Sequence, residues 1–347
     1  MRFKSLALAA LLTVALAMPV QAQAKREIAA PAGAPWKHAQ TGMTLPSSLL
    51  GIARGAIGDN SSSEIDVFAG YGDDQATTIT LYVFRPALAS VPMWFDRSES
   101  QVLMRDVYGN ATPVAAPMAF APPGSKTTSG LRRIYLPGKG PYKSTGLAIM
   151  PMGEWLVAVR ISSQQFDAAA LDAKLDEVIK AIGWPGSVAD SDAAVPVAVC
   201  TAPIAYAKKA KLKPPSMMDA LLGATLSNIK PTDEEKAKAV PVTWCREGQP
   251  KQEYAVYRAV GNGSGYTIAM GDAGRVIYVS PGLALDSKDP GYQLSLGLLD
   301  QTLIYPSFDK LPAPDAAIDA VMKGRPISST TRGSKDITIT TGAMKTK

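Results

Sequence analysis

Histidine and cysteine, the side chains that most often act as bases, nucleophiles or metal ligands, are scarce in this chain. The 347 residues contain one histidine, His38, and two cysteines, Cys200 and Cys245. Serine and cysteine hydrolases need a base that a third group orients, and the sequence contains no Gly-x-Ser-x-Gly motif. Zinc needs three or four ligands at once. The sequence therefore predicts no catalytic residue of this kind and no metal site, and we interpret His38 as a surface residue.

Carboxylates are the remaining groups that could do chemistry, because a pair of them can hydrolyse sugars without histidine. Glu154 precedes Trp155, and Asp96 follows Trp94 by two residues. Since an aromatic ring beside a carboxylate could stack on a sugar, we take Glu154, Trp155, Asp96 and Trp94 as candidate ligand-binding residues. The sequence does not place two carboxylates at the distance that sugar hydrolysis requires. A turn at 151–154 explains Glu154 equally well.

Two further patterns resemble ligand-binding loops. Gly261-x-Gly263-x-Gly265 resembles a phosphate loop, but such a loop opens a helix, and residues 266–270 have the pattern of a strand. Residues 59–66 are as rich in side-chain oxygen as a calcium loop, but they lack the glycine and the distal glutamate of an EF-hand. We interpret both as connections between strands, and no cofactor is predicted.

The N-terminus has the pattern of a cleavable secretory signal. A positively charged start precedes an apolar run over 6–18, and residues 21–24 follow a small-x-small pattern. The run is shorter than the ~20 residues needed to cross a bilayer, and no later run is long enough. We expect residues 1–24 to be removed near Ala24, leaving a periplasmic or secreted chain without a transmembrane segment.

The two cysteines are expected to form one disulfide. Disulfides persist in exported proteins, and Cys200 and Cys245 have neither the spacing of a Cys-x-x-Cys redox pair nor partners for a metal. A bridge between them would close a loop worth roughly 4 kcal/mol in the chain-entropy model.

The charge balance is mildly basic, with 36 lysines and arginines against 30 acidic residues. The densest basic cluster lies at 208–213, where Tyr206 is the only neighbouring aromatic residue. We interpret this cluster as a solvated face and expect no nucleic-acid partner.

Alternating and helical patterns organise residues 36–184 into one α+β unit that follows a flexible leader at 25–35. Strands are predicted at 64–71, 77–85 and 131–136, a helix opens at Pro92, and 147–161 forms a hairpin. The clearest helix carries an apolar stripe of Leu171, Leu175, Val178, Ile179 and Ile182.

The order of these elements resembles that of the PsbP/Mog1-like α+β family. The resemblance rests on an opening segment at Thr41–Pro46 and a closing helix at Leu171–Trp184. It covers the first half of the chain and implies an accessory or binding module. Because members of that family share no catalytic residues, it implies no active site.

A second unit is expected after a linker rich in proline, serine and alanine at 185–198. Within 199–327 we predict a helix capped by Ser216, three strands at 252–260, 266–270 and 275–279, an ambiguous apolar segment at 294–305, and a short helix at 315–322. A disordered tail is expected at 328–347. The predicted fold is thus α+β with two domains, each a mainly antiparallel sheet with helices packed on one face.

Two functional hypotheses remain open. The first is an exported, non-catalytic periplasmic or cell-envelope binding or accessory protein, whose partner is an unidentified envelope protein or small ligand. The alternative is a carboxylate-dependent hydrolase that acts on envelope or extracellular polysaccharide. The missing catalytic motifs favour the first hypothesis.

Overall fold

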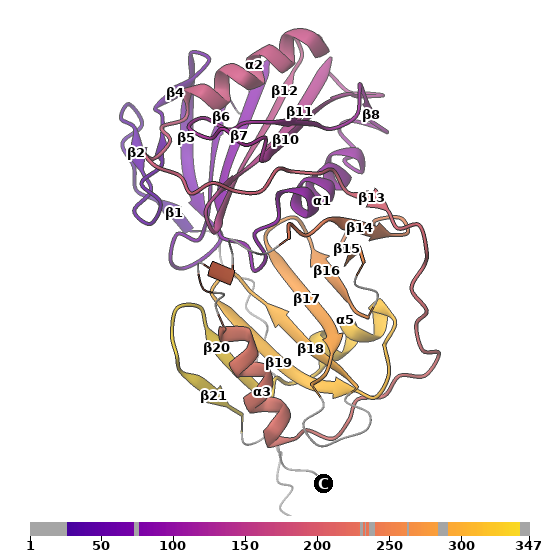
Figure 1. Cartoon of the computed structure of the whole chain (residues 1–347). Helices are drawn as coiled ribbons and strands as arrows, with labels where there is room; N and C mark the ends of the chain where they lie inside the picture. Colours follow the sequence, from indigo (N-terminus) through magenta and orange to yellow (C-terminus); the bar gives the residue numbers. More distant parts are fainter. Residues whose placement is uncertain are drawn as a thin grey trace, which may run out of the picture.

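The computed structural model describes residues 26–72, 76–229, 232, 234–235, 240–261, 264–283 and 291–340. Within this part of the chain, two large β-sheets, a two-stranded sheet and several α-helices make a mixed α+β fold, as the sequence predicts (Figure 1). No helix among the described residues combines the length and the apolar character needed to cross a membrane. The expected signal, residues 1–24, lies outside the described residues.

The N-terminal sheet pairs antiparallel strands in the order β1-β5-β6-β7-β12-β11-β10-β8, with β4 beside β5 and β9 beside β10. Their bounds are β1 (Arg26–Ile28), β4 (Ser48–Leu49), β5 (Ile52–Asp59), β6 (Asp66–Tyr71), β7 (Thr77–Phe84), β8 (Thr112–Pro113), β9 (Met118–Phe120), β10 (Gly130–Leu136), β11 (Ser144–Met152) and β12 (Trp155–Ser163). The small sheet pairs β2 (Trp36–Lys37) with β3 (Thr44–Leu45). The predicted hairpin is formed by β11 and β12, and Gly153 supplies the positive φ of its turn.

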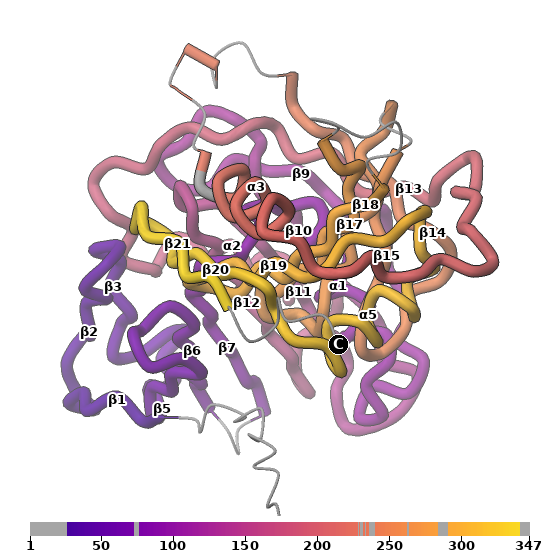
Figure 2. Tube along the Cα trace, turned by 90° about the horizontal axis from the view of Figure 1, so that it is seen from below, coloured from indigo at the N-terminus to yellow at the C-terminus, as the bar shows by residue number. Residues whose placement is uncertain are grey.

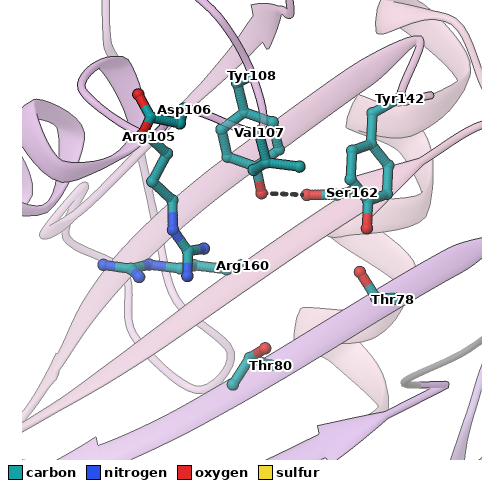
Figure 3. A pocket seen from close by; sticks show the side chains of 9 residues that line it. All are labelled: Thr78, Thr80, Arg105, Asp106, Val107, Tyr108, Tyr142, Arg160 and Ser162. Atoms are coloured by element: carbon teal, nitrogen blue, oxygen red, sulfur yellow. Dashed lines mark hydrogen bonds between the residues drawn. The ribbon is translucent and has the colours of Figure 1, made fainter. Parts of the chain in front are cut away.

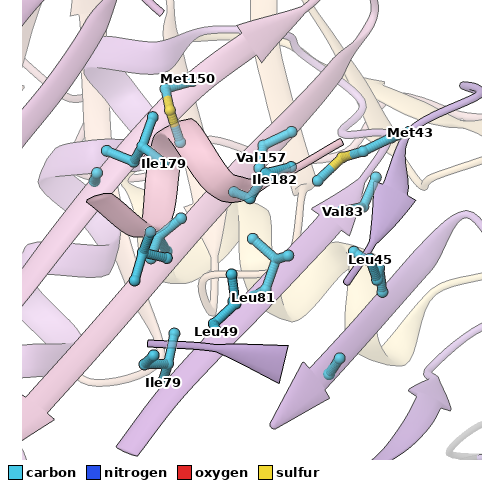
Figure 4. Packing of buried hydrophobic residues seen from close by; sticks show 14 of the residues in the cluster. Met43, Leu45, Leu49, Ile79, Leu81, Val83, Met150, Val157, Ile179 and Ile182 are labelled. Atoms are coloured by element: carbon cyan, nitrogen blue, oxygen red, sulfur yellow. The ribbon is translucent and has the colours of Figure 1, made fainter. Parts of the chain in front are cut away.

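Helix α2 (Ala168–Ala181) covers one face of this sheet. The Asp167 side chain caps its first turn by accepting a hydrogen bond from the Ala170 amide at 2.9 Å. The predicted apolar stripe is buried against alternate residues of β7 and β12, among them Ile79, Leu81 and Val157 (Figure 4). Burial of this stripe is the main force that holds α2 in place.

Helix α1 (Val91–Leu103) lies on the opposite face of the same sheet. Ser90 caps it, and Trp94 and Phe95 are buried in a second apolar cluster with Leu147 and Leu156. The expectation that helices pack on one face is therefore wrong. Both faces of the central strands are apolar, and β11 is buried along its whole length, so each face needs its own cover.

The C-terminal sheet runs in the chain order β13 to β21, and only its first pair, β13 with β14, is parallel. The bounds are β13 (Ala198–Val199), β14 (Trp244–Glu247), β15 (Tyr254–Ala259), β16 (Tyr266–Met270), β17 (Arg275–Pro281), β18 (Tyr292–Gly297), β19 (Gln301–Phe308), β20 (Ser328–Thr331) and β21 (Ile337–Ile339). The ambiguous segment 294–305 belongs to β18 and β19. The predicted disulfide between Cys200 and Cys245 is present.

Two helices cover opposite faces of the C-terminal sheet. Helix α5 (Pro314–Lys323) packs against a cluster that includes Tyr305. Helix α3 (Met217–Asn228) begins at the predicted cap, Ser216, and packs against Ile304, which points to the other face of β19. Ile304 and Tyr305 are successive residues on β19 and thus pack against different helices.

The two large sheets share an apolar cluster. Ala255, Tyr257, Ala269 and Val276 of the C-terminal sheet pack with Trp94 of α1 and its neighbours in the N-terminal sheet. A backbone hydrogen bond of 2.8 Å from the Ala87 amide to the Gly274 carbonyl also joins the halves. Helix α1 therefore packs against both sheets (Figure 1).

Both ends of the described chain form β-strands, where a flexible leader and a disordered tail were expected. Residues Arg26–Ile28 of the expected leader pair with β5, and residues 328–339 of the expected tail contribute β20 and β21. Backbone hydrogen bonds to neighbouring strands hold these short strands in place, and their serine- and threonine-rich or charged composition does not reveal that pairing. The last seven residues, 341–347, lie outside the described part.

Candidate functional site

The structure places Trp94 and Asp96 inside the molecule. The Trp94 indole N–H donates a hydrogen bond of 2.7 Å to the Leu88 carbonyl, and the ring is fully buried. The Asp96 carboxylate accepts hydrogen bonds from Arg246 and, at 2.8 Å, from the Tyr257 hydroxyl. Asp96 therefore ties α1 to the C-terminal sheet, and Trp94 offers no face to a ligand from solvent.

Glu154 and Trp155 lie at the hairpin turn between β11 and β12. The Glu154 carboxylate is half exposed and lies 3.3 Å from the Arg332 guanidinium. The Trp155 ring is buried, with the ring of His38 edge-on at 5.0 Å between centroids. Glu154 and Asp96 thus have separate partners, and the structure does not bring them together as a pair of catalytic carboxylates.

His38 is buried and not at the surface, which corrects the sequence interpretation. Its Nε2 lies 2.7 Å from the Glu64 carbonyl oxygen, and its Nδ1 lies 2.8 Å from the Thr41 hydroxyl. Since a carbonyl only accepts, Nε2 carries a proton and donates it to the Glu64 carbonyl. His38 fastens the turn before β3 to the loop before β6 and is not placed as a catalytic base.

In the oxygen-rich loop 59–66, neighbouring donors satisfy the carboxylate of Asp59. The Asp59 carboxylate accepts hydrogen bonds from the Ser61 amide at 2.8 Å and from the Glu64 amide at 3.0 Å, and Arg26 pairs with it at 3.2 Å. No group of three potential metal-ligating side chains occurs among the described residues. The Gly261–Gly265 connection joins the antiparallel strands β15 and β16, although Asn262 and Gly263 lie outside the described part.

A polar pocket of about 420 Å³ opens on the face of the N-terminal sheet that α1 also covers. Its walls are the sheet and the loop after α1 (Figure 3). Hydroxyl and guanidinium groups dominate the lining, which comprises Thr78, Thr80, Arg105, Asp106, Val107, Tyr108, Tyr142, Arg160 and Ser162. We call this the arginine pocket. None of the four predicted ligand-binding residues lines it.

Strand alternation explains why the floor of the arginine pocket is polar. On β7, Thr78 and Thr80 alternate with Ile79 and Leu81, which face α2. On β12, Arg160 lies directly opposite Thr80, and Ser162 lies opposite Thr78. Because successive side chains of a strand point to opposite faces, these four polar side chains share one face beyond the end of α1.

A chain of hydroxyl groups fixes the far wall of the pocket. The Tyr108 and Ser162 hydroxyls lie 2.8 Å apart (Figure 3), and the Ser162 hydroxyl also lies 2.8 Å from the Thr145 hydroxyl. The Tyr142 ring packs edge-to-face against Tyr108, with centroids 5.8 Å apart. The aromatic wall is therefore held in place before any ligand arrives.

Arg160 is the best-positioned cation of the pocket. Its Nη2 donates to the Asp272 carboxylate of the C-terminal sheet at 2.5 Å, and the guanidinium lies over the Tyr82 ring. Its Nε–H is buried without a hydrogen-bond partner among the described residues. Burial alone lowers the pKa of Arg160, but Asp272 and Tyr82 raise it on balance, so the guanidinium stays charged.

Arg105 supplies a second guanidinium from the exposed loop that follows α1. Its side chain extends into the pocket towards Arg160, whereas the carboxylate of the neighbouring Asp106 points away (Figure 3). Two guanidinium groups and several hydroxyls make the pocket rich in hydrogen-bond donors. Such a lining suits a ligand group with several acceptor oxygens, such as a carboxylate or a phosphate.

Another pocket of similar size, about 440 Å³, lies beside α2 and is a weaker candidate. Its charged residues, Lys174 and Glu177, pair with each other at 2.9 Å on successive turns of the helix. Because this pair satisfies its own charges, the pocket presents no convergent group to a ligand.

Comparisons with known proteins identify no relative of this chain. No family model, no curated protein and no solved structure matches it. The site is therefore argued from its own geometry.

Sequence reasoning missed the arginine pocket, although part of its signal was present. Within β12 it recognised Val157, Val159 and Ile161 as one face, and the opposite face turns from apolar at Ala158 to polar at Arg160. A change from apolar to polar residues along one face of a buried strand indicates the floor of a polar pocket. The pattern does not show which strand lies alongside or which loop closes the pocket.

Proposed function

We propose that this chain is an exported, non-catalytic binding or accessory protein of the periplasm or cell envelope, and that its arginine pocket binds a small ligand with a carboxylate or phosphate group. The signal-like N-terminus and the disulfide support export. The observation that carries the ligand class is the convergence of Arg105 and Arg160 with the hydroxyls of Thr78 and Thr80.

The proposal includes a two-domain organisation, with units at 36–184 and 199–327 that share the cluster around α1. It also retains the resemblance of the first unit to the PsbP/Mog1-like family, whose members act as binding or accessory modules. Under this proposal the pocket belongs to the first unit, and the second unit contributes Asp272, the partner of Arg160.

Size and chemistry narrow the ligand. A pocket of about 420 Å³ is at the lower end of the range for small-molecule sites, which suits a molecule of monosaccharide size. Acceptor oxygens would be met by the guanidinium groups of Arg105 and Arg160 and by threonine hydroxyls, and the Tyr142 ring would cover an apolar face. The pocket lining includes one carboxylate, Asp106, so it lacks the pair that sugar hydrolysis requires.

Thermal stability in the presence of matched ligands tests this proposal. Glucuronate and glucose 6-phosphate should raise the melting temperature in a concentration-dependent way, whereas neutral glucose at the same ionic strength should not. The Arg105→Gln variant should lose the shift, and Lys335→Gln, which removes an exposed cation far along the chain, should keep it. Equal shifts with glucose, or an unchanged response in Arg105→Gln, would refute the proposed ligand class.

A further inference from the structure

Helix α3 presents its small residues to the sheet and its large apolar residues to solvent. Ala220 and Ala224 are fully buried against Ile304 and Ile327. In contrast, the exposed side chains of the helix and its C-terminal cap include five large apolar ones, Met217, Met218, Leu221, Leu226 and Ile229. A helix on the surface of a soluble protein usually has the opposite arrangement.

The inward face of α3 depends on small residues because the helix lies close to the sheet. A Cβ atom at Gly223 would come within 2.8 Å of the Ile304 methyl group and within 2.1 Å of the Gln293 amide nitrogen. The Ser227 and Thr330 hydroxyls lie 3.1 Å apart on the same side. The large side chains therefore cannot be accommodated by turning the helix over, and their exposure is built into the packing.

The chain that leads into α3 carries the basic cluster 208–213. Its backbone is attached to the end of β19, where the Lys213 amide donates to the Ser307 carbonyl at 2.7 Å and the Asp309 amide donates to the Lys211 carbonyl at 2.9 Å. Lys208, Lys209 and Lys211 are exposed, and so is Leu212 between them and the helix. Met217 lies four positions after Lys213, so the two lie within about 14 Å.

The basic cluster leads directly into the helix that carries the exposed apolar residues. Helix α3 and the stretch of chain before it lie on the near side in Figure 2, and both lie at the bottom in Figure 1. We call this surface, formed by Lys208, Lys209, Lys211, Leu212 and the exposed apolar residues of α3 and its cap, the α3 face.

We propose that the α3 face docks the protein on an anionic phospholipid surface. Exposed apolar side chains beside lysines match the two layers of such a surface, acyl chains beneath negatively charged headgroups. Methionine and leucine side chains enter the boundary of the acyl region, and lysine stems reach back to the headgroups. The proposal goes beyond ligand binding and does not depend on the arginine pocket.

The charge complementarity is what selects a membrane over an apolar groove of another protein. Each lysine near an anionic surface strengthens binding roughly fivefold, so three lysines contribute roughly 100-fold at low salt. Each apolar side chain that leaves water contributes roughly another tenfold. High salt should remove the lysine contribution and leave the apolar one.

Vesicle co-sedimentation tests the proposal with the full chain. We expect binding to vesicles of equal parts phosphatidylglycerol and phosphatidylcholine and much weaker binding to pure phosphatidylcholine. Changing Lys208, Lys209 and Lys211 to glutamine together should weaken binding roughly 100-fold at low salt. The double variant Met218→Ser and Leu221→Ser should weaken it at low and at high salt, because these side chains are exposed and contribute through burial.

Matched controls use exposed residues elsewhere. Changing Lys126, Lys180 and Lys335 to glutamine removes the same charge, and Met322→Ser removes an exposed apolar side chain from α5, so neither should affect vesicle binding. All variants carry the same N-terminus, so binding through residues 1–25 is common to them. Arg105→Gln should also bind vesicles normally, which separates this proposal from the ligand proposal.

Three results would overturn the membrane proposal. The first is absence of binding to the anionic vesicles, and the second is equal weakening by the α3-face variants and their controls. The third is a dimer in solution that the Met218→Ser and Leu221→Ser changes convert to a monomer, because the α3 face would then be covered by a second copy.

Discussion

At the scale of single residues, Arg160 has two roles. Its guanidinium lines the arginine pocket and also holds Asp272 of the C-terminal sheet. An arginine can do both because its planar head presents five N–H donors in fixed directions. The pocket and the contact between the sheets are therefore linked through one side chain.

The variant Arg160→Met separates packing from charge at this position. It keeps an extended side chain but leaves Asp272 without its cation, so the free energy of unfolding should fall. Asp272 is 35% exposed, and solvent screens part of the loss, so we expect about 2 kcal/mol and not the 3–5 kcal/mol typical of fully buried pairs. Urea unfolding measures this change, and a variant as stable as the wild type would show that the pair contributes nothing.

Asp66 makes a pH-dependent contribution to stability. It is buried beside a small cavity of about 80 Å³ between the sheets, and its Oδ2 has no hydrogen-bond partner among the described residues. Burial raises the pKa of Asp66, while Asn60 and Arg275 oppose that shift. The folded state thus holds its proton more tightly than the unfolded state, and stability is lost as pH rises through the folded-state pKa.

The variant Asp66→Asn should therefore be more stable than the wild type at pH 7. As pH falls below the raised pKa, the wild-type side chain also becomes neutral, and the difference between the two melting temperatures should shrink. Thermal unfolding at pH 7 and at acidic pH measures both values. A difference that grows towards acidic pH would contradict this assignment.

At the scale of elements, local patterns predict the strands and helices that bury an alternating or helical stripe. The α2 stripe from Leu171 to Ile179 and the β11–β12 hairpin are examples. The edge strand β1 and the terminal strands β20 and β21 were not predicted, because backbone hydrogen bonds to neighbouring strands hold these short strands and no apolar pattern marks them.

The site was harder to predict than the elements. Trp94 and Trp155 were selected for their aromatic rings, yet both rings are buried in the core. The arginine pocket needs the register of β7 against β12 and a loop that follows α1, which no local pattern specifies. The disulfide was predicted because compartment and cysteine number alone determine it.

The Cys200–Cys245 bridge fastens the start of the C-terminal half to β14, where β13 pairs in parallel. Replacing both cysteines by serine should destabilise the protein by up to about 4 kcal/mol, because the bridge closes a loop that spans 45 residues. For a chain of this length, that loss corresponds to a melting temperature lower by about 6 °C. An unchanged melting temperature would show that the bridge adds no stability.

At the scale of the whole molecule, the two sheets are joined by apolar and ionic contacts. The cluster around Trp94 contains residues of both sheets, and the ion pairs of Asp96 with Arg246 and of Glu154 with Arg332 also cross between them. If one half unfolded alone, the cluster would be exposed to water, and the other half would lose the burial that stabilises it.

We therefore expect one cooperative unfolding transition for the whole chain. Differential scanning calorimetry should give a single peak whose calorimetric and van't Hoff enthalpies agree. Two resolved peaks would show that the shared cluster contributes little and that the halves unfold independently.

The central claim is that the arginine pocket binds a ligand through its oxyanion group. Isothermal titration calorimetry of glucuronate and glucose 6-phosphate into the wild type and Arg105→Gln tests it most directly. We predict that both ligands bind the wild type with a stoichiometry of one, and that Arg105→Gln binds each at least roughly tenfold more weakly. No heat of binding with either ligand, or equal affinity in the two proteins, would contradict the claim.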